Sequence, residues 1–406
     1  MVLLEAIARI RDDLPAPVAV LNFDHGIDPN AVVWAELVVA AAARLGVPCR
    51  VEHLHLGPGA GETRARSMRY DALARIMAPG DCCLSAHHAD DQGETFLLHA
   101  LRGAGLDGLS AMPMLKVFGT GWLGRPLMGW SRRQLTRWAL GVGLEWIEDP
   151  ANRNLRVPRN WLRQQLWPVL EAIWPDPGRR LAATVGRLGE ARSLLEEVAV
   201  EDLNRLGNTV DCECLPVEAL LQLSLPRRHN LLRYWLRARA LPVPSARKLD
   251  EMEARFILRD PGPRAAMSWS GCELHRYRGY LYAFASYPEL PDQFRPLSLD
   301  SSVDLGRLGQ VGLVLDPAGE VDISLLESSL NLRFRCGGER IHPQNSRHHR
   351  ALKKLMQEAR VFPWMRNRLP LVYAGADLIA VMGLTVAECA VGHGLRLEWK
   401  SAPRWR

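Results

Sequence analysis

Several features that mark other protein classes are missing from this 406-residue sequence. Its eight cysteines include no Cys-x-x-Cys pair, and the closest pairs are Cys82-Cys83 and Cys212-x-Cys214. Zinc ribbons, thioredoxin-type chemistry and cysteine-ligated iron–sulfur clusters therefore lack their usual spacing, and scattered reduced thiols fit the cytosol. No apolar run approaches a membrane span, the first residues have no signal-peptide pattern, and no internal repeat is found. We therefore expect a cytoplasmic protein with no membrane partner.

What the sequence contains is the composition of an ordinary globular protein, with 48% hydrophobic and 24% charged residues. The length exceeds what a single hydrophobic core supports, so we expect two to four domains. The 51 Lys and Arg residues outnumber the 45 Asp and Glu residues, which gives a net charge of +6. This basic excess is a mild indication of a polyanionic partner such as nucleic acid.

The first 177 residues predict strands that alternate with helices. Continuous apolar runs indicate buried parallel strands, and apolar residues at helical spacing indicate the helices between them. The predicted strands are 18–23, 49–54 and 82–86, and the predicted helices are 1–10, 30–45, 62–77 and 131–140, the last with Ser131 as its N-cap. This alternation is typical of an α/β domain with a doubly wound, mostly parallel sheet.

The strongest candidate site directly follows the strand predicted over 82–86. His87, His88, Asp90, Asp91 and Glu94 place five titratable groups within eight residues, at the start of a helix. Asp91 and Glu94 are three residues apart and share a helical face, and the helix macrodipole stabilises acids in the first turn. Open α/β sheets present ligand-handling groups at this edge, which favours a functional site. Helix capping and a metal site remain alternatives, although His-His followed by Asp-Asp is not a standard zinc spacing.

Arginines elsewhere in the first domain supply candidate anion contacts. Arg66 and Arg69 lie on the helix predicted over 62–77. Arg159 and Arg163 are four residues apart at the start of a later helix, where they can bind phosphate or carboxylate in a bidentate manner. The alternative is that they form only surface salt bridges.

The rest of the chain divides into a bridging helix over 178–214, a middle domain over 215–290 and a last domain over 297–406 that is β-rich with one helix. A basic helix over 226–239 carries Tyr234 and Trp235, which can stack on bases or belong to the core. The last domain has seven cations in a segment up to Lys354 whose one acidic residue is Glu339. This charge pattern is typical of a phosphate-binding patch or of a solvated basic face. These cations are Arg333, Arg335, Arg340, Arg347, Arg350, Lys353 and Lys354.

In their order and spacing these motifs resemble one family, the tRNA(Ile)-lysidine synthetases of the PP-loop ATP pyrophosphatases. The resemblance covers nearly the whole chain, and it depends on the combination because each motif alone is weak. The segments that carry it are Asp24-His25-Gly26, 65–70, 87–95, 101–106, 125–127, 146–150, 159–160, 333–340, 352–355 and 370–371.

The resemblance implies a two-step ligation with ATP and Mg²⁺ as cofactors. ATP would adenylate the wobble cytidine in the CAU anticodon of tRNA(Ile) and release diphosphate, and the ε-amine of L-lysine would then displace AMP to give lysidine. Asp91 and Glu94 match positions associated with lysine recognition, and His87 would orient the substrate or accept a proton. The other implied contacts are Arg66, Arg69, Arg159 and Arg163 for lysine, cytidine or phosphate, Asp24, His25 and Gly26 for ATP, and the seven cations of the last domain for tRNA. A homodimer is left open.

One family element is absent from the 406 residues: the nucleotide loop Ser-Gly-Gly-x-Asp-Ser and the strand before it. In the family a hydrophobic helix follows this loop, and Met1-Val2-Leu3-Leu4 resembles its first turn. We therefore expect the true start to lie upstream of Met1. The loop cradles pyrophosphate with backbone N–H groups, and its strand is central in the sheet, so loss of both should unpair two neighbours and leave little or no activity.

Three other functions remain open. One is a PP-loop enzyme that thiolates tRNA, although such enzymes often use cysteine pairs. Another is a non-catalytic tRNA-binding protein that has lost its nucleotide loop, which a stop codon directly upstream would favour. The last is a metal-dependent hydrolase built on His87, His88, Asp90 and Asp91, which analysis of bound metal would test.

Overall fold

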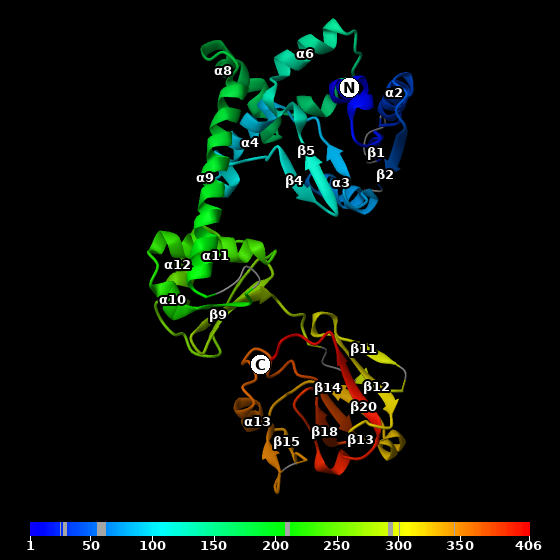
Figure 1. Ribbon diagram of the computed structural model, residues 1–406, viewed down its shortest axis with the longest axis vertical. Helices are drawn as coiled ribbons and strands as arrows, with labels where there is room; N and C mark the ends of the chain where they lie inside the picture. Colours follow the sequence, from blue (N-terminus) through cyan, green and yellow to red (C-terminus); the bar gives the residue numbers. More distant parts are fainter. Residues whose placement is uncertain are drawn as a thin grey trace. The chain divides into compact units, whose positions relative to one another are not determined.

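The computed structural model forms two compact units, Met1–Leu195 and Glu196–Arg406 (Figure 1). The residues it describes are 1–24, 26, 31–54, 62–207, 212–290, 295–299, 301–344 and 346–406. The boundary between the units falls inside helix α9 (Pro177–Arg205), within the segment predicted to bridge domains. None of the described helices has the length and apolar character that a membrane span requires.

The first unit alternates helices and strands close to the predicted positions. Its strands are β1 (Val20–Asp24), β2 (Cys49–His53), β3 (Cys82–Leu84), β4 (Leu115–Phe118) and β5 (Gly121–Gly124). Its helices are α1 (Val2–Arg9), α2 (Ala31–Arg44), α3 (Glu62–Ile76), α4 (Ala89–Leu101), α5 (Leu106–Leu109), α6 (Arg132–Gly141), α7 (Pro158–Trp161), α8 (Trp167–Ile173) and α9. A π-helical turn over Leu162–Leu166 connects α7 to α8.

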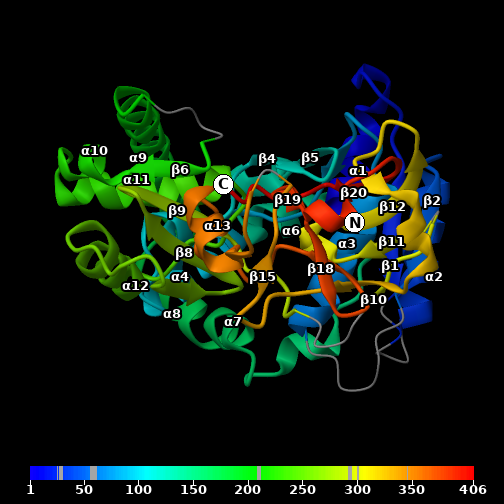
Figure 2. The ribbon, with the colours of Figure 1, turned by 90° about the horizontal axis from the view of Figure 1, so that it is seen from below.

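The sheet of this unit occurs in two pieces in the described part of the chain. Strand β1 pairs in parallel with β2, while β3 pairs in parallel with β5, and β4 closes the second piece as an antiparallel edge. Figures 1 and 2 show the two pieces with helices around them. The predicted fold class is confirmed as a mostly parallel α/β domain, and no described strand joins β1 to β3.

Local capping signals set where the two helices around the candidate site begin. Helix α4 starts after His88, whose backbone N–H donates to Asp91 Oδ2 at 3.1 Å. Helix α6 starts after Ser131, which forms a capping box with Gln134: Ser131 N–H donates to Gln134 Oε1 at 2.9 Å, and Ser131 Oγ accepts from the Gln134 N–H at 3.4 Å. The predicted N-cap at Ser131 is therefore confirmed.

The second unit contains two hydrophobic cores, one between Ala199 and Ala283 and the other between Leu297 and Leu395. The first core packs α10 (Val217–Leu221), α11 (Leu225–Ala238) and α12 (Ala246–Met252) on a sheet of order β6-β9-β8-β7. Its strands are β6 (Cys214–Pro216), β7 (Ala266–Trp269), β8 (Cys272–Tyr277) and β9 (Tyr280–Ala285). Trp235 lies fully inside this core and donates its indole N–H to the Cys212 carbonyl at 2.9 Å, so the core interpretation is right for this residue.

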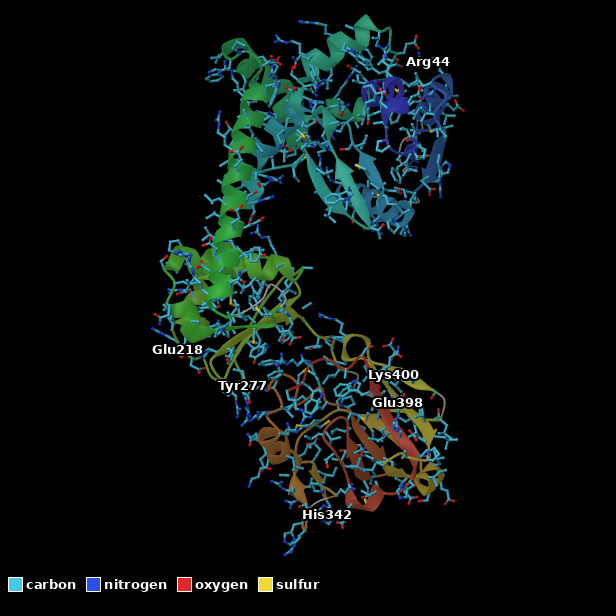
Figure 3. All side chains as sticks on the ribbon, in the orientation of Figure 1. Arg44, Glu218, Tyr277, His342, Glu398 and Lys400 are labelled. Carbon is cyan, nitrogen blue, oxygen red and sulfur yellow. The ribbon has the colours of Figure 1, made fainter. Side chains whose placement is uncertain are left out.

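The second core lies among short antiparallel strands and, in the described residues, one α-helix, α13 (Leu352–Glu358). Two larger sheets have the orders β10-β14-β17-β18-β19 and β11-β12-β20-β13, and β15 pairs with β16. The strands are β10 (Arg295–Pro296), β11 (Ser302–Asp304), β12 (Gln310–Asp316), β13 (Val321–Asp322), β14 (Leu330–Arg333), β15 (Arg340–Ile341), β16 (Arg350–Ala351), β17 (Leu371–Ala374), β18 (Asp377–Val381), β19 (Thr385–Val386) and β20 (Gly394–Lys400). Aromatic contacts connect the cores: Tyr277 (Figure 3) packs edge-on against Phe362 with ring centroids 5.9 Å apart.

Candidate active site

Asp90 is a structural anchor for the elements around the site. Its Oδ2 accepts a hydrogen bond from the backbone N–H of Arg132 at 2.5 Å, and its Oδ1 accepts from the indole N–H of Trp167 at 3.0 Å. Burial raises the pKa of Asp90, but hydrogen bonds from His88, Arg132 and Trp167 together lower it further, so the net shift is downward. One buried carboxylate thus joins the start of α4 to the first residues of α6 and α8.

Two glycines allow this close packing around Asp90. A side chain at Gly178 would bring its Cβ to 2.5 Å from Asp90 Oδ1 and 3.0 Å from Asp90 Cα. At Gly93 the Cβ would lie 2.8 Å from the Trp167 ring and 3.0 Å from Leu181 Cδ1. Helices α4 and α9 therefore approach each other at positions where a Cβ atom does not fit.

Asp91 and Glu94 are both bound by Arg163, as their shared helical face predicts. The guanidinium donates from Nε to Glu94 Oε1 at 2.7 Å and from Nη2 to Glu94 Oε2 at 2.8 Å. The same Nη2 donates to Asp91 Oδ1 at 3.0 Å. Only 1% of Glu94 is exposed, and burial raises its pKa against the opposing effect of Arg163. The pKa of Arg163 is raised, because its bonds to Glu94 outweigh the opposing effect of burial.

Arg159 completes this ion cluster from one turn earlier. Its Nη2 donates to Thr95 Oγ1 at 2.7 Å, and its Nε lies 3.5 Å from Glu94 Oε2. The surface salt-bridge alternative for Arg159 and Arg163 is therefore wrong. The cluster thus contains three carboxylates, Asp90, Asp91 and Glu94, and two guanidiniums. Its formal net charge is −1.

His87 lies between this acidic cluster and a group of cations. Its Nδ1 is 2.7 Å from Ser85 Oγ. Burial lowers the pKa of His87 to about 4; Asp91 opposes the shift, and the charges of Arg125, Arg66 and Arg159 add to it. The imidazole is therefore neutral at physiological pH and suits hydrogen bonding and orientation better than holding a proton.

Arg125 was not among the predicted site residues, although its segment carries part of the family resemblance. Only 3% of it is exposed, and its Nη1 donates to the Pro113 carbonyl at 2.7 Å. Its Nε is buried without a hydrogen-bond partner, and no carboxylate pairs with it in the described part of the chain. A buried cation without a counter-ion is costly, so this guanidinium is suited to an anionic ligand.

The remaining predicted residues of the first unit lie farther from the acids. Arg66 is exposed and stacks over Tyr70, with its guanidinium 5.3 Å from the ring centroid. Arg69 is also exposed, and no described contact joins it to α4. Asp24 ends β1 and accepts from the Gly26 N–H at 2.8 Å. His25 lies outside the described residues.

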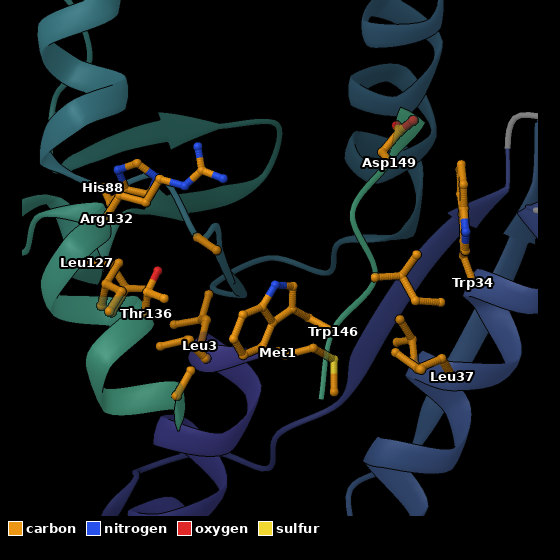
Figure 4. Close-up of a pocket in the computed structure, with 16 residues that line it drawn as sticks. Met1, Leu3, Trp34, Leu37, His88, Leu127, Arg132, Thr136, Trp146 and Asp149 are labelled. Carbon is orange, nitrogen blue, oxygen red and sulfur yellow. The ribbon is translucent and has the colours of Figure 1, made fainter. Parts of the chain in front are cut away.

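A mainly apolar cavity of about 500 Å³ opens beside α4 (Figure 4). The start of α1, with Met1 and Leu3, lines it together with Trp34 of α2, and His88 and Arg132 lie on the opposite wall. The remaining lining residues are Val2, Leu37, Val38, Ala86, Leu127, Leu135, Thr136, Ala139, Trp146, Ile147 and Asp149. Trp146 belongs to a segment that carries the family resemblance, whereas the sequence around Trp34 offers no comparable signal.

A second cavity of about 520 Å³ lies between α6 and α8. Asp90, Glu94 and Arg163 contribute to its lining, so the buried acids of α4 reach it directly. The other lining residues are Arg132, Arg133, Thr136, Arg137, Leu140, Trp167, Pro168 and Glu171. Arg132 and Thr136 line both cavities, which places the first turns of α6 between them.

The predicted basic patch of the second unit is partly neutralised by local contacts. Arg350 binds Glu358 at 2.6 Å, a partner that the charge count missed because it ended at Lys354. Arg335 lies 3.3 Å from Glu339 and donates to Asn367. Arg333 stacks over Tyr373 at 4.5 Å, and Arg340 donates to the His349 carbonyl. Of the seven, Arg347, Lys353 and Lys354 are exposed and make neither an ion pair nor a hydrogen bond in the described part of the chain, and Arg340 is exposed with only its bond to a carbonyl.

Three segments of the chain match family models. Residues 1–170 match a PP-loop domain, residues 215–282 the TilS substrate binding domain, and residues 330–399 the TilS substrate C-terminal domain. The chain is 36% identical to the tRNA(Ile)-lysidine synthase of Alkalilimnicola ehrlichii over 95% of its length and 87% of that relative. It is 34% identical to the corresponding synthase of Coxiella burnetii over 98% of this chain and 89% of the relative. For Pseudomonas putida the identity is 35%, over 98% of this chain and 92% of the relative. The predicted resemblance is confirmed, and the chain belongs to the tRNA(Ile)-lysidine synthase family.

Proposed function

We propose that this chain ligates L-lysine to the wobble cytidine in the CAU anticodon of tRNA(Ile), in the cytoplasm and at the expense of ATP. In the first step the cytidine O2 attacks the α-phosphorus of ATP, and the bond to the diphosphate leaving group breaks. In the second step the lysine ε-amine attacks C2, the C2–O bond to AMP breaks, and the nitrogen releases a proton. The products are lysidine, AMP and diphosphate.

The observation that carries this proposal is the separation of charge around His87. Arg125 and Arg66 supply positive charge near His87 on which a phosphoryl group can be stabilised, and Arg125 has no counter-ion in the described residues, whereas Arg159 already pairs with Glu94. Asp91 and Glu94 supply the negative charge that an ammonium needs. An adenylating ligase that uses an amine requires both charges next to each other.

The cavity of Figure 4 is the part of the first unit that best fits ATP. Trp34 and Trp146 give it apolar aromatic walls for a base, and the first residues of α1, at the positive end of the helix dipole, also line it. Mg²⁺ would neutralise charge on the ATP phosphates, and Asp149 is a carboxylate on the cavity wall that can take part in holding it.

The second unit is proposed to bind tRNA away from the anticodon. Arg347, Lys353 and Lys354 remain available for phosphate contacts, whereas Arg335 and Arg350 already have carboxylate partners. We therefore expect the three free cations to contribute more to tRNA affinity than the two paired arginines.

Incorporation of radiolabelled lysine into a tRNA(Ile) transcript with a CAU anticodon tests the proposal, with a methionine tRNA as the control. We expect ATP-dependent incorporation into the first tRNA only. Absence of incorporation into this tRNA would refute the proposal, and incorporation of sulfur in place of lysine would favour the tRNA-thiolating alternative.

A second candidate is a tRNA-binding protein without catalytic activity, which the exposed cations Arg347, Lys353 and Lys354 also fit. The Asp91→Asn variant separates the two. For the ligase we expect the variant to lose lysine incorporation while ATP still adenylates the tRNA, because Asp91 serves the amine and not the phosphates. For the binding protein, wild type and variant should retain tRNA affinity, and neither should form AMP.

A further inference from the structure

Ser85 directly follows β3 and lies two residues before the His-His segment that carries part of the family resemblance. Its Oγ is 2.7 Å from Nδ1 of His87. We propose that Ser85 is a positioning residue for the ligation: its hydroxyl donates to Nδ1 and fixes the His87 tautomer in which Nε2 carries the hydrogen. This inference rests on the proposed function for the reaction that His87 serves.

The sheet and α4 hold Ser85 and His87 in place. The Ser85 N–H donates to the Gly124 carbonyl at 2.9 Å, which continues the parallel ladder of β3 and β5 by one residue. Arg125 follows Gly124, so Ser85 and Arg125 occupy neighbouring places at the carboxyl ends of adjacent strands. After His87, the Ala89 N–H donates to the Trp130 carbonyl at 2.9 Å and fixes the start of α4. The Ser85 hydroxyl therefore meets the imidazole between two anchored points of the backbone.

Only one direction of the bond between Ser85 and His87 uses the hydroxyl hydrogen. A hydroxyl has one hydrogen to donate, and a neutral imidazole has one N–H group and one acceptor nitrogen. If Ser85 donates to Nδ1, its hydrogen is bonded and the ring hydrogen is on Nε2. If Nδ1 donated instead, the hydroxyl hydrogen would have no acceptor among the described residues. The first direction satisfies both groups and is the one assigned.

The surroundings of His87 keep a second hydrogen off the ring. Burial lowers its pKa, the charges of Arg125, Arg66 and Arg159 add to this effect, and Asp91 opposes it. The ring is therefore neutral at physiological pH and carries one hydrogen. Under these conditions the bond to Ser85 decides which of the two nitrogens has it.

Nε2 is the nitrogen of His87 that remains for a substrate. No described residue forms a hydrogen bond with it, and it is not among the buried atoms that lack a partner, so solvent reaches it. The next histidine differs, because His88 Nδ1 is buried and its ring contacts Asp90 and Asp91. The repeated histidine in the sequence thus has one member for the helix start and one for the substrate.

A hydrogen on Nε2 makes His87 a donor in the reaction. Beside Arg125 and Arg66, this donor can bind an oxygen of the phosphoryl group without adding a further positive charge. The same nitrogen has no free lone pair, so it cannot take a proton from the attacking lysine amine. Of the two roles expected from the sequence, orienting the substrate and accepting a proton, the tautomer set by Ser85 leaves the first.

Nuclear magnetic resonance reads the tautomer directly on the full chain. Two-bond correlation spectra of protein labelled with ¹⁵N-histidine distinguish a ring nitrogen with hydrogen from one without. The chain has 12 histidines, and the signals of His87 are those that disappear in His87→Gln. At pH 7.5 we expect Nδ1 without hydrogen and Nε2 with it. In Ser85→Ala the Nδ1 signal should move toward the protonated position, because both tautomers become populated, while Ser85→Thr should keep the wild-type pattern.

Kinetics then show whether the tautomer matters for the reaction. Transfer of label from [α-³²P]ATP to the tRNA(Ile) transcript, without lysine, measures the adenylation step. Loss of one hydrogen bond between neutral groups should slow this step about fivefold in Ser85→Ala, with the KM for lysine unchanged and the rate restored in Ser85→Thr. The matched control is Ser110→Ala, which removes another buried hydroxyl, bonded to the Asp107 carbonyl at 3.0 Å, and should react as the wild type does.

Failure of this inference differs from failure of the proposed function. If the wild type ligates lysine but hydrogen is found on Nδ1, the tautomer assignment is overturned and the ligase proposal stands. If Ser85→Ala changes the tautomer but adenylates as fast as Ser110→Ala, the positioning role is overturned. If Ser85 fixes hydrogen on Nε2 and the wild type modifies no tRNA, the proposed function fails and takes the role in the ligation with it. Unchanged signals from the other histidines verify that each variant is folded.

Discussion

Replacement of Arg163 by methionine removes the cation that compensates the most buried carboxylate of the site. Arg163 makes three charge-assisted hydrogen bonds, two to Glu94 and one to Asp91, at 2.7 to 3.0 Å. After the substitution, the one described cation near Glu94 is Arg159, with its Nε at 3.5 Å. Removing one partner of a buried ion pair costs about 3–5 kcal/mol, and we expect a loss of this size in the free energy of unfolding.

The loss should depend on pH in a defined direction. Burial already raises the pKa of Glu94 above its ordinary 4.5, and without Arg163 it should rise further. In the variant, the folded chain then keeps a proton on Glu94 at pH values where the unfolded chain has released it. The free energy of unfolding therefore decreases as pH rises through this window, and Arg163→Met should be more destabilised at pH 8 than at pH 5.

Chemical denaturation followed by circular dichroism measures the effect on the full chain. The matched control is Arg133→Met in the same unit, which breaks the exposed pair with Asp176 and should cost less than about 1 kcal/mol. The double variant Arg163→Met with Glu94→Met should recover part of the stability, because the most buried charge is removed while Asp91 still lacks its guanidinium partner. A cost for Arg163→Met equal to that of the control, at both pH values, would refute the role assigned to this ion pair.

Three further predictions concern other parts of the molecule. The pKa of His87 is lowered from 6.5 to about 4, so unfolding takes up a proton between these values and stability falls as pH drops through them. His87→Gln should remove this dependence, which solvent screening of the partly exposed ring reduces to about 1–2 kcal/mol, measured by denaturation from pH 4 to 7. Gly178→Ala should cost about 1–3 kcal/mol because its Cβ meets Asp90, whereas Gly186→Ala on the same helix has open space and should stabilise by up to about 1 kcal/mol, both measured by thermal unfolding. Lys353→Ala with Lys354→Ala should lower the slope of log affinity for tRNA against log salt concentration by about two, and an unchanged slope would argue against a phosphate contact there.

Periodicity was sufficient to predict β1, β2 and β3 of the first unit, but not β4 and β5. Apolar runs predicted β1 and β3, and helical spacing together with Ser131 as N-cap predicted α6 to within one residue. These signals are local, since they depend on neighbours in the same element. The pairing of β1 with β2 and of β3 with β5 in two pieces depends on strand partners, which the spacing of elements alone does not reveal.

The roles of neighbouring acids could not be separated from the sequence. Asp90 and Asp91 are adjacent, and a helix turns about 100° per residue, so they face different surroundings. Asp90 points at the starts of α6 and α8 and serves as an anchor, whereas Asp91 shares Arg163 with Glu94. The distinction arises from α6 and α8, which lie more than 40 residues away in the sequence.

Charge counts along the chain failed for a related reason. Seven cations against one acid suggested a strongly basic patch, but Glu358 neutralises Arg350 from the far end of α13. In the first unit, the spacing of Arg159 and Arg163 predicted phosphate or carboxylate contacts without indicating which, and both bind Glu94 of α4. A linear count includes charges but not their partners, so it overestimates the free charge wherever the fold brings opposite signs together.

The charges of the ion cluster around Glu94 are only partly balanced, and this has a consequence for the proposed reaction. A fully compensated cluster would have no use for a further cation, and an uncompensated one would destabilise the fold. Three acids against two guanidiniums lie between these limits: the fold tolerates one excess negative charge, and a substrate ammonium can neutralise it. The same excess would hold the lysine amine in its charged form, so the amine must lose a proton before it attacks the adenylated base. On this argument the acids provide affinity and position, and the lowered pKa of His87 keeps a second positive charge away from the attacking nitrogen.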